Sequence, residues 1–405
     1  MRQTPKQKTM IPEEFKVKAE KTIEMLKDYK KAEILLIHHD DADGLCSAAI
    51  TKESLERKGY KVKTFCIEKL LPEIIKKVHN GENRVIFYCD IASPHAKLIS
   101  KVNSGRNLTI ILDHHDPSPS EDPMVLDLNL EHFGFKGEED FSGATCSYLF
   151  AKVLDDKNFD LSYLALVGSC EIPVGFVGLN RMVLNESLGN GVIKAKGKSY
   201  IISKFDISVK DLFSKLQILG SVGFYIGGPV LGVKVCLEGL TEEAKRLVED
   251  LEEKRKKVNR RIIAMLYKKG FNETEHIQWF DVGDAYKGMG TKTIGTLCSY
   301  ISYQRKLIKQ EKYIIGIMNM EPEIPNFGKL SKEYSKVSVR VPRLLKKLVD
   351  RGEMPFAVEL LHEATGNFGL AVDGHAYAAS CIIPRELKNE MINLAEKFIQ
   401  SYGKK

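Results

Sequence analysis

Histidine and aspartate side chains gather in one short stretch of the sequence, His-His-Asp-Asp-Ala-Asp at residues 38–43. An isolated Asp90 and the triplet Asp-His-His at residues 113–115 supply the same kinds of donor further along the chain. Mixtures of carboxylate and imidazole ligands suit Mn²⁺ or a similar divalent ion. The three positions together indicate a metal centre rather than three unrelated sets of turn residues.

The donors suffice for two metal ions. Two ions about 3.5–4 Å apart need a bridging carboxylate with further ligands on either side, and Asp90 is the natural bridge. We expect His39 and Asp41 to complete one site, and Asp43 with His114 to complete the other. Such a pair of ions lowers the pKa of a bridging water and stabilises both oxygens of a phosphoryl displacement. The pattern therefore predicts a metal-dependent phosphoesterase.

Each set of donors follows or ends a short apolar run that is typical of a buried parallel strand. The runs are Ile34–Ile37, Val85–Cys89 and Leu108–Leu112, with helical patterns between them at Cys46–Lys58 and Ala96–Val102. This alternation predicts an α/β fold with a doubly wound, largely parallel sheet. Ligands of such sheets bind outside the carboxyl ends of the strands, so the donors should meet at one edge. The donors of residues 41–43 are expected in a tight loop before the first helix.

A length of 405 residues is too great for one ordinary core, so we expect more than one domain. Residues 241–269 keep one apolar stripe behind the plausible N-cap Thr241, and their exposed part reads EKRKKVNRR. We interpret this segment as a helix that connects a domain of residues 1–240 to a smaller α/β domain of residues 270–405. In the second domain HIQWFDVGD, YIIGIMNM and SKVSVRVP predict strands, and TIGTLCSYIS predicts a buried helix.

The composition is that of a soluble globular protein, with 43% hydrophobic and 28% charged residues. No apolar run approaches the roughly 20 residues that cross a bilayer, and the first residues, Met-Arg-Gln-Thr-Pro-Lys, show no secretory segment. We therefore expect a cytoplasmic protein that does not bind membranes. The eight cysteines include no Cys-x-x-Cys pair, which favours reduced thiols over a zinc ribbon. A net charge of +7 is compatible with a nucleic-acid partner.

The motifs resemble those of the DHH phosphoesterase superfamily, whose signature triplet is the Asp-His-His found here at residues 113–115. HDDADGLCSAA is similar to the first motif of that family, and FYCDIASP is similar to its second. The closer resemblance is to RecJ-like exonucleases, especially archaeal ones. DGHAYAASCIIP at Asp373–Pro384 resembles the glycine-rich pattern and Ile-Pro strand of the DHH-associated domain. Ser-Val-Arg at residues 338–340 resembles its Ser-x-Arg strand.

The resemblance implies two lobes joined by a long helix, with two Mn²⁺ or Mg²⁺ ions in the first lobe. Asp113, His114 and His115 would then be catalytic, with His115 orienting His114 or contacting a phosphate. The second lobe would bind the nucleic-acid backbone through residues of the two motifs named above. These are Ser338, Arg340, Gly374 and His375, of which Arg340 and His375 would donate hydrogen bonds to phosphate. The Gly-His pair is expected in a turn that precedes a helix.

The sequence departs from the family pattern at positions that bear on catalysis. The family supplies a fourth acidic motif, and its Asp falls on Ile172 here, beside Glu171. The second ion would then depend on Glu171 as a substitute ligand. In the glycine-rich pattern, Asp373 and Ser380 replace glycines. Asp373 would repel a phosphate unless its side chain points away.

The main hypothesis is an exonuclease of DNA repair or replication that hydrolyses single-stranded DNA or RNA from an end by two-metal water activation. Tyr377 is a candidate for stacking on a base. A first alternative is a catalytically weakened, RecJ-like scaffold subunit beside the archaeal replicative helicase and GINS. A second alternative is an oligoribonucleotide phosphodiesterase of the nanoRNase type. The intact donors favour an enzyme, whereas Ile172 and Asp373 favour the scaffold.

Overall fold

The computed structural model describes residues 11–402. Met1–Lys6, on which the expectation of no secretory segment partly rests, lie outside the described residues. The chain divides into two compact units, which we call the N-terminal unit (Met1–Gly220 and Gly227–Val248) and the C-terminal unit (Ser221–Ile226 and Glu249–Lys405). None of the described helices is both long enough and apolar enough to cross a membrane.

The N-terminal unit is built on a five-stranded sheet with the order β2-β1-β3-β4-β5, in which every neighbouring pair is parallel. β3 and β4 are buried along their whole length, as expected of strands covered on both faces. The strands are β1 (Glu33–His39), β2 (Lys61–Ile67), β3 (Val85–Cys89), β4 (Leu108–Leu112) and β5 (Val125–Asp127). β1, β3 and β4 correspond to the three strands that the sequence predicts.

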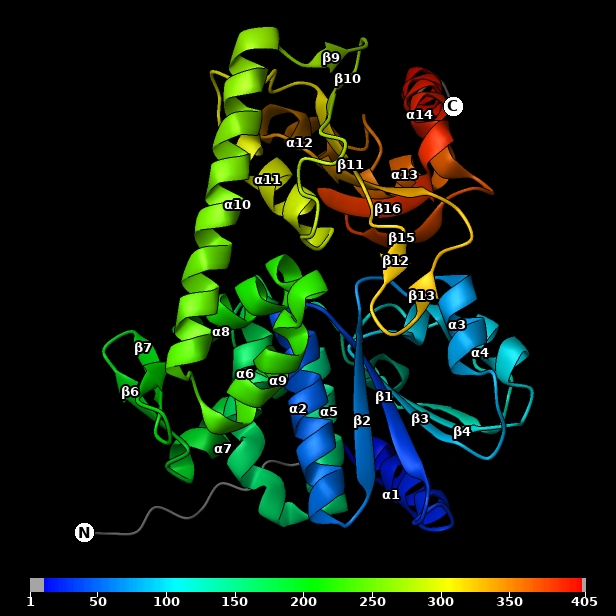
Figure 1. Ribbon diagram of the computed structural model, residues 1–405, viewed down its shortest axis with the longest axis vertical. Helices are drawn as coiled ribbons and strands as arrows, with labels where there is room; N and C mark the ends of the chain where they lie inside the picture. Colours follow the sequence, from blue (N-terminus) through cyan, green and yellow to red (C-terminus); the bar gives the residue numbers. More distant parts are fainter. Residues whose placement is uncertain (1–10, 403–405) are drawn as a thin grey trace. The chain divides into compact units, whose positions relative to one another are not determined.

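Helices cover both faces of this sheet (Figure 1). α2 (Ala42–Arg57) and α5 (Gly143–Leu154) lie on one face, and α3 (Pro72–Val78) and α4 (Ala96–Asn103) lie on the other. The chain moves from β1 to β2 in one direction and then returns past β1 to β3, so the winding reverses between β1 and β3. Ligands of doubly wound sheets bind at such a reversal, outside the carboxyl ends of the strands. The predicted fold class is confirmed.

The remaining elements of the N-terminal unit surround this sheet. A small antiparallel sheet has the order β6-β7-β8. The helices are α1 (Glu13–Lys27), α6 (Ser162–Gly168), α7 (Gly178–Gly189), α8 (Val209–Gln217) and α9 (Gly228–Glu238), and the small strands are β6 (Ile193–Lys196), β7 (Ser199–Ile202) and β8 (Ile207–Ser208). A π-helical turn, η5 (Ile218–Val222), follows α8.

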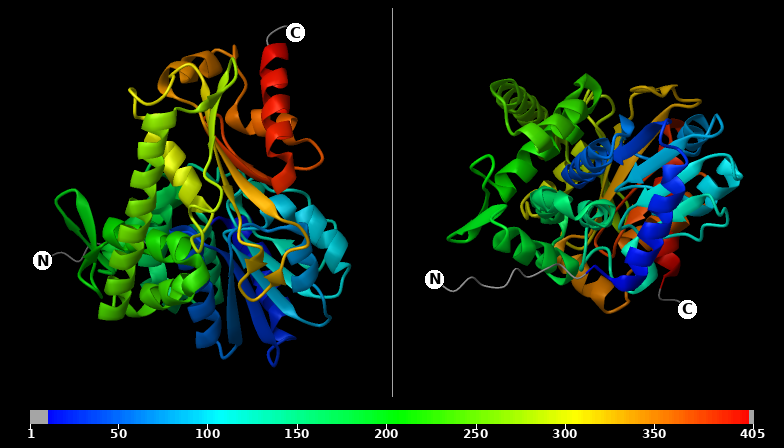
Figure 2. Two further views of the ribbon diagram at one scale, coloured as in Figure 1. Left: turned by 45° about the horizontal axis from the view of Figure 1, so that its top comes forward. Right: turned by 90° about the horizontal axis from the view of Figure 1, so that it is seen from below.

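The C-terminal unit contains a mixed sheet with the order β15-β16-β14-β11-β10-β9, in which only β10 and β11 pair in parallel. One apolar cluster joins one face of this sheet to α12, α13 and α14, and α11 packs on the other face (Figure 2). The strands are β9 (Asn272–Glu273), β10 (Ile277–Asp281), β11 (Tyr313–Asn319), β14 (Tyr334–Arg340), β15 (Leu370–Gly374) and β16 (Ala378–Pro384), with a separate pair β12 (Glu323–Ile324) and β13 (Gly328–Lys329). The helices are α11 (Lys292–Ser302), α12 (Arg343–Asp350), α13 (Ala357–Thr365) and α14 (Lys388–Ser401).

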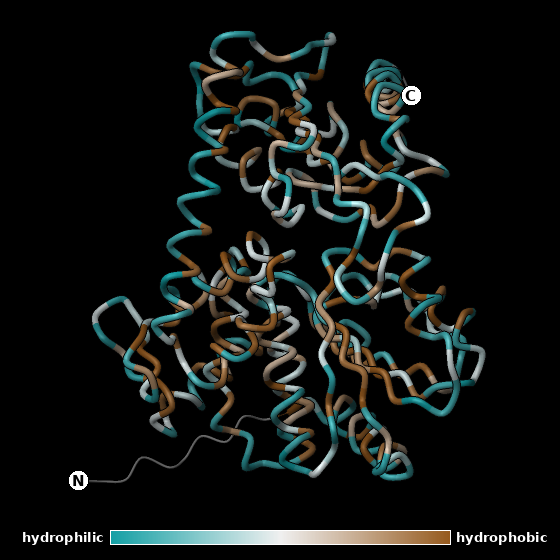
Figure 3. Tube along the Cα trace, in the orientation of Figure 1, coloured by the Kyte–Doolittle hydropathy of each residue, from teal (hydrophilic) through white to brown (hydrophobic). Residues whose placement is uncertain are grey.

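The long helix predicted at residues 241–269 is α10 (Glu242–Lys269). The hydroxyl of Thr241 accepts a hydrogen bond from the Ala244 amide at 3.2 Å, which is the expected N-cap contact. Much of α10 is hydrophilic, whereas the strands of the N-terminal sheet are mostly hydrophobic (Figure 3). In the sequence, the boundary between the two compact units falls inside this helix, after Val248. The domain limits proposed from the sequence stay a prediction.

Candidate metal centre

The first donors lie where β1 passes directly into α2. The Asp41 carboxylate accepts a hydrogen bond from the Gly44 amide at 2.8 Å and so caps the helix, which begins at Ala42. The expectation of a tight loop followed by a helix from Cys46 is therefore wrong, because Asp41 nucleates the first turn. Asp43 is part of that turn. A β-carbon on Gly44 would lie 2.5 Å from the carbonyl oxygen of His39, so only glycine lets the helix start so close to the strand.

Asp90 stands at the end of β3 with a strained backbone. Its φ is +58°, in the left-handed region, and Ala92 follows with φ +105°. Non-glycine residues rarely adopt these angles, and such strain concentrates at functional sites. The Asp90 amide donates to the carbonyl oxygen of Leu112 at 2.8 Å, which helps to hold this conformation.

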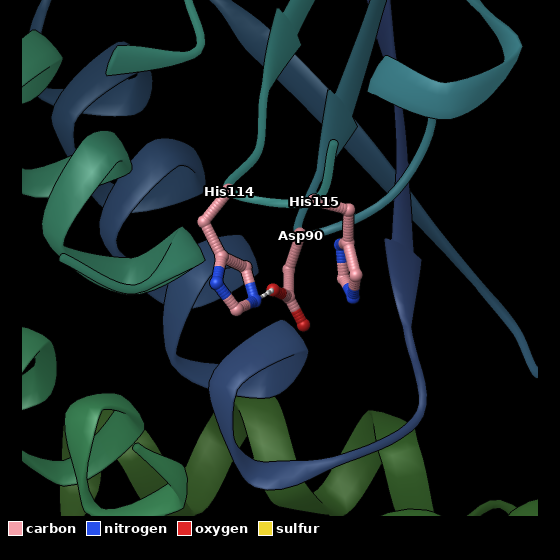
Figure 4. Close-up of side chains that lie close together, drawn as sticks. All are labelled: Asp90, His114 and His115. Carbon is pink, nitrogen blue, oxygen red and sulfur yellow. Dashed lines mark ion pairs between the residues drawn. The ribbon is translucent and has the colours of Figure 1, made fainter. Parts of the chain in front are cut away.

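Two groups of potential ligands share Asp90. One group is His39, Asp41 and Asp90, and the other is Asp90, His114 and His115; within each group the donor atoms lie within 4.8 Å of one another. Nδ1 of His39 lies 2.6 Å from Oδ2 of Asp41 and 3.6 Å from Oδ2 of Asp90. His39, Asp41, Asp90 and His114 are all at most 8% exposed. The side chains of the second group converge in Figure 4.

The orientation of His114 makes its outer nitrogen available to a cation. Its Nδ1 lies 3.0 Å from the carbonyl oxygen of Gly137, which can only accept, so Nδ1 carries a proton. Its Nε2 faces Oδ1 of Asp90 at 3.3 Å and Oδ2 of Asp43 at 3.8 Å. A lone pair directed at two carboxylates is unfavourable, so this nitrogen needs either a proton or a metal ion between it and the oxygens. The same contacts raise the pKa of His114 well above its usual value, although burial opposes them.

Asp113 fixes the loop that carries both histidines. Its Oδ1 accepts from the His114 amide at 2.8 Å and faces Nδ1 of His115 at 2.7 Å, while its Oδ2 accepts from the Ser93 amide at 2.8 Å. Burial alone would raise the pKa of Asp113, but His115 and the other donors lower it to about 2. The ionised carboxylate therefore accepts a hydrogen bond from Nδ1 of His115, so the lone pair of the ring lies on Nε2. In this geometry Asp113 positions His115.

Asp43 is held by the beginning of α5. Its carboxylate accepts from the hydroxyl of Ser142 at 3.0 Å and from the amides of Gly143 and Ala144 at 2.8 and 2.9 Å. Ser142 also caps α5, since its hydroxyl accepts from the Thr145 amide. Burial nevertheless raises the pKa of Asp43. Sequence reasoning missed these residues, although Ser-Gly-Ala-Thr before an apolar helix is a recognisable N-cap pattern.

Three glycines leave room for the acids of the site. A β-carbon would lie 2.3 Å from Oδ1 of Asp90 if placed on Gly143, and 2.1 Å from Oδ1 of Asp43 if placed on Gly168. On Gly220, in η5, it would lie 1.9 Å from the carbonyl oxygen of Asp40. The sequence does not indicate what these glycines touch, and only the fold shows it.

The buried acids fit a divalent cation. Burial and then the charges of Asp43 and Asp41 raise the pKa of Asp90 well above its usual value, which shows how crowded the negative charge is. In the described part of the chain, the ion-pair partners of Asp43 and Asp90 are histidines rather than lysine or arginine. Carboxylate oxygens and imidazole nitrogens are the ligands that Mn²⁺ and Mg²⁺ sites use. A cation held among them relieves the repulsion.

The proposed substitute ligand, Glu171, belongs to neither group of closely spaced donors. It ends the short 3₁₀ turn η4 (Ser169–Glu171), and the next residue, Ile172, is 3% exposed. The apolar side chain of Ile172 thus occupies a buried position. The use of Glu171 as a ligand stays a prediction.

A third group of donors lies in the C-terminal unit, at Glu275, His276 and Glu396. Here the acid already has partners: Glu396 accepts from the Thr274 hydroxyl and from the His276 amide, and it faces Nδ1 of His276 at 2.7 Å. These contacts join the start of β10 to α14. The group therefore has a structural explanation that needs no metal ion.

Arg340, the predicted phosphate-binding residue, is largely buried at the end of β14. It donates to the hydroxyls of Ser299 and Ser338 at 2.8 and 2.9 Å, and to the carbonyl oxygens of Val339 and Gly295. Among the described residues it has no carboxylate partner, and burial lowers its pKa. Such a cation is suited to an anionic ligand. Ser338 supports Arg340 in this arrangement.

Gly374 ends β15, and His375 begins the turn that leads into β16, so the expectation of a helix after this pair is wrong. The His375 amide donates to Ala378 across the turn, and the two strands continue their pairing from there. Gly374 has φ +135°, and a β-carbon on it would lie 2.4 Å from the Ala378 carbonyl oxygen. Asp373 pairs with Ser380 in the same hairpin. Their side chains therefore share one face of the sheet.

Comparison with known proteins relates part of the chain to one family model and the whole fold to solved structures. Residues 33–168 match the model of the DHH family, N-terminal domain. No curated protein matches the chain. The structure of RecJ from Thermus thermophilus in complex with Mn²⁺ superposes with a TM-score of 0.68 at 17% identity, covering 98% of this chain and 56% of that one. This chain thus spans little more than half the length of the Thermus protein.

Two further structures share the fold over nearly their whole length. Exonuclease RecJ bound to manganese has a TM-score of 0.62 at 17% identity, covering 99% of this chain and 96% of that one. CDC45 from Entamoeba histolytica has a TM-score of 0.56 at 13% identity, covering 95% and 99%. Identities this low establish the fold alone. Residues 33–168 therefore match the DHH family, N-terminal domain, in a chain whose fold is similar to those of RecJ and CDC45.

Proposed function

We propose that this protein is a divalent-metal-dependent phosphodiesterase that removes nucleotides from an end of single-stranded DNA or RNA. One observation carries the proposal: two groups of His and Asp donors, from β1 and from β4, share the strained Asp90 at the reversal of the sheet. A carboxylate common to two groups of ligands is what a two-ion centre needs. Mn²⁺ is the preferred ion and Mg²⁺ the alternative.

The residues around Asp90 have distinct roles in this proposal. His39 and Asp41 would hold one ion with Asp90, and His114 with Asp43 would hold the other. The ions would supply Lewis-acid activation of water and of the phosphate. Asp113 positions the His115 ring through Nδ1, so that Nε2 would contact a phosphate oxygen or hold a proton there.

Cationic features of the C-terminal unit support a polymeric anion as the substrate. Arg340 has no carboxylate partner among the described residues. The segment 254–261 of α10 reads KRKKVNRR and contains no acid. Regularly spaced phosphates would satisfy such cations, and binding should weaken as the salt concentration rises.

The test is digestion of end-labelled single-stranded DNA and RNA with Mn²⁺, beside Mn²⁺ binding followed by electron paramagnetic resonance. The Asp90→Ala protein should lose both bound ions and at least about 1,000-fold in rate, since one residue serves both sites. Asp156→Ala, a change at an exposed acid of the same unit, is the control. Undiminished Mn²⁺ binding by Asp90→Ala would disprove the assignment of the ligands.

A scaffold beside a replicative helicase or GINS is the second candidate, because Ile172 stands where the family supplies an acid. No hydrolysis by the wild-type protein, on either polymer or on short oligoribonucleotides, would favour this candidate. Ile172→Asp separates the two functions. A large gain in rate would show that the second ion lacks a ligand, whereas a loss of stability without any gain would assign Ile172 to the core.

A further inference from the structure

Helix α11 presents one face to the sheet of the C-terminal unit and the opposite face to solvent. Ile294, Leu297, Cys298 and Ile301 are buried, and Cys298 packs so closely on β11 that it excludes any side chain at Gly316. On the outer face Tyr300 is 55% exposed and Tyr303, just past the end of the helix, is 83% exposed. The latter value is the highest among the large apolar and aromatic side chains that the structure describes.

Arg340 lies beside this tyrosine-bearing face. Its Nε donates to the Ser299 hydroxyl at 2.8 Å, and its Nη2 donates to the Gly295 carbonyl oxygen at 3.2 Å. Ser299 and Tyr303 are four residues apart on a helical backbone, so their β-carbons are neighbours about 6 Å apart. Tyr303 therefore lies one helical turn from the serine that contacts the guanidinium group.

The surroundings of the two tyrosines are cationic. Residues 291–310 contain Lys292, Arg305, Lys306 and Lys309 and no acid. Arg305 and Lys306 follow Tyr303 closely in the chain and are exposed, and neither is paired with a carboxylate within residues 11–402. A peptide or lipid tail would leave these charges unmatched, whereas a chain of phosphates complements them.

We propose that Tyr303, assisted by Tyr300, stacks on bases of single-stranded nucleic acid whose phosphate is held by Arg340. This inference rests on the proposed function and specifies how its substrate is held. The aromatic face is sequence-tolerant because every base has a π-face, and the cation beside it fixes the phosphate next to the stacked base. Tyr377, the stacking candidate taken from the sequence, is instead engaged by Lys346 over its ring and by Asp350 at its hydroxyl.

Binding of a fluorescein-labelled oligodeoxyadenylate of about 12 nucleotides, measured by anisotropy in EDTA, tests the stacking without hydrolysis. An abasic oligomer of the same length keeps the phosphates and removes the bases. Tyr303→Ala should raise the Kd for the base-containing oligomer about tenfold and leave the Kd for the abasic oligomer unchanged. Tyr303→Phe should bind like the wild type, because stacking needs the ring and not the hydroxyl. Tyr267→Ala, at a 59% exposed tyrosine of α10, is the matched control.

Equal affinities of Tyr303→Ala and wild type for the base-containing oligomer would overturn the inference. So would an equal loss on both oligomers, or a loss in Tyr303→Phe as large as in Tyr303→Ala. The proposed hydrolysis is judged separately, by digestion with Mn²⁺. A protein that stacks bases without cutting would refute the phosphodiesterase alone, and one that cuts while Tyr303→Ala binds normally would refute the stacking alone.

Discussion

The carboxyl edge of the N-terminal sheet carries an excess of negative charge, whereas the α11 face of the C-terminal sheet carries an excess of positive charge. At the first, buried carboxylates crowd around Asp90, and their described ion-pair partners are histidines. At the second, the half-buried Arg340 has no carboxylate partner among the described residues and has exposed cations nearby. Each region is incomplete without an ion of the other sign. From this difference we infer that the first surface attracts metal ions, and we propose that the second attracts phosphates.

After the loss of Asp90 itself, the largest expected effect comes from closing the space beside this shared acid. Gly143→Ala places a methyl group 2.3 Å from Oδ1 of Asp90 and must displace the carboxylate. We expect the Mn²⁺-dependent rate to fall at least about 100-fold, as for a displacement of about 1 Å in a catalytic group. The rate on labelled single-stranded DNA is the measurement.

Gly189→Ala is the matched control, because a β-carbon on this helical glycine meets nothing within 4 Å. If Gly143→Ala retained full activity with unchanged Mn²⁺ binding, Asp90 would not occupy the position that we assign to the shared ligand.

A smaller effect should follow from loosening Asp43. Ser142→Ala removes one donor to Asp43 and the N-cap of α5, so we expect an activity loss of about tenfold and a stability loss of about 1 kcal/mol. Ser208→Ala removes the equivalent N-cap of α8, because the Ser208 hydroxyl accepts a hydrogen bond from the Asp211 amide. This control should lose similar stability in urea unfolding and keep its activity. Equal activities of the two variants would separate Asp43 from the metal centre.

At the cationic face, Arg340→Lys keeps the charge but loses the planar fork that contacts Ser299 and Ser338 together. We expect the Kd for single-stranded DNA to rise about fivefold, with hydrolysis of a dinucleotide less affected. Anisotropy over a range of salt concentrations is the measurement. An unchanged Kd would show that the guanidinium serves the fold alone.

The smallest effect concerns Glu396, in the donor group that we assign to structure. Burial alone would raise its pKa, but hydrogen bonds from Thr274 and His276 lower it below the ordinary value of 4.5. Since the folded pKa is the lower one, the carboxylate stabilises the fold above pH 4.5, and this contribution is lost as the pH falls through the lowered value. Glu396→Gln should cost about 1 kcal/mol at pH 7 and progressively less near pH 3. Urea unfolding at both pH values measures it, and a Zn²⁺-dependent rise in Tm that Glu396→Gln abolishes would contradict the assignment.

The sequence was informative where donors follow buried strands. His39, Asp41 and Asp90 could be grouped because parallel strands bring their carboxyl ends to one edge, and the apolar runs before them are unambiguous. The start of α2 was misplaced by four residues, because Asp41 was taken as a loop ligand when it also caps the helix. Periodicity likewise located α10 within a residue at its beginning.

Contacts made by single residues without a motif could not be predicted. Gly143 and Gly168 matter only because folding brings them against Asp90 and Asp43, and no local pattern records such a distance. The packing of α11 on β14 brings Arg340 to Ser299, one helical turn before Tyr303, and joins segments about 40 residues apart. The hairpin at Gly374 was mistaken for a turn before a helix, because its glycine serves either structure.

The anchoring of Asp43 by α5 has a consequence for how firmly ions stay bound. Both oxygens of Asp43 already accept hydrogen bonds from Ser142, Gly143 and Ala144. An ion beside Asp43 would therefore compete with these fixed donors for the oxygen lone pairs. Asp90 has no such commitment to backbone amides among the described residues. We therefore expect unequal retention on dialysis: purified protein should keep the ion shared by His39 and Asp41 longer, and should need free Mn²⁺ in the buffer to refill the other position.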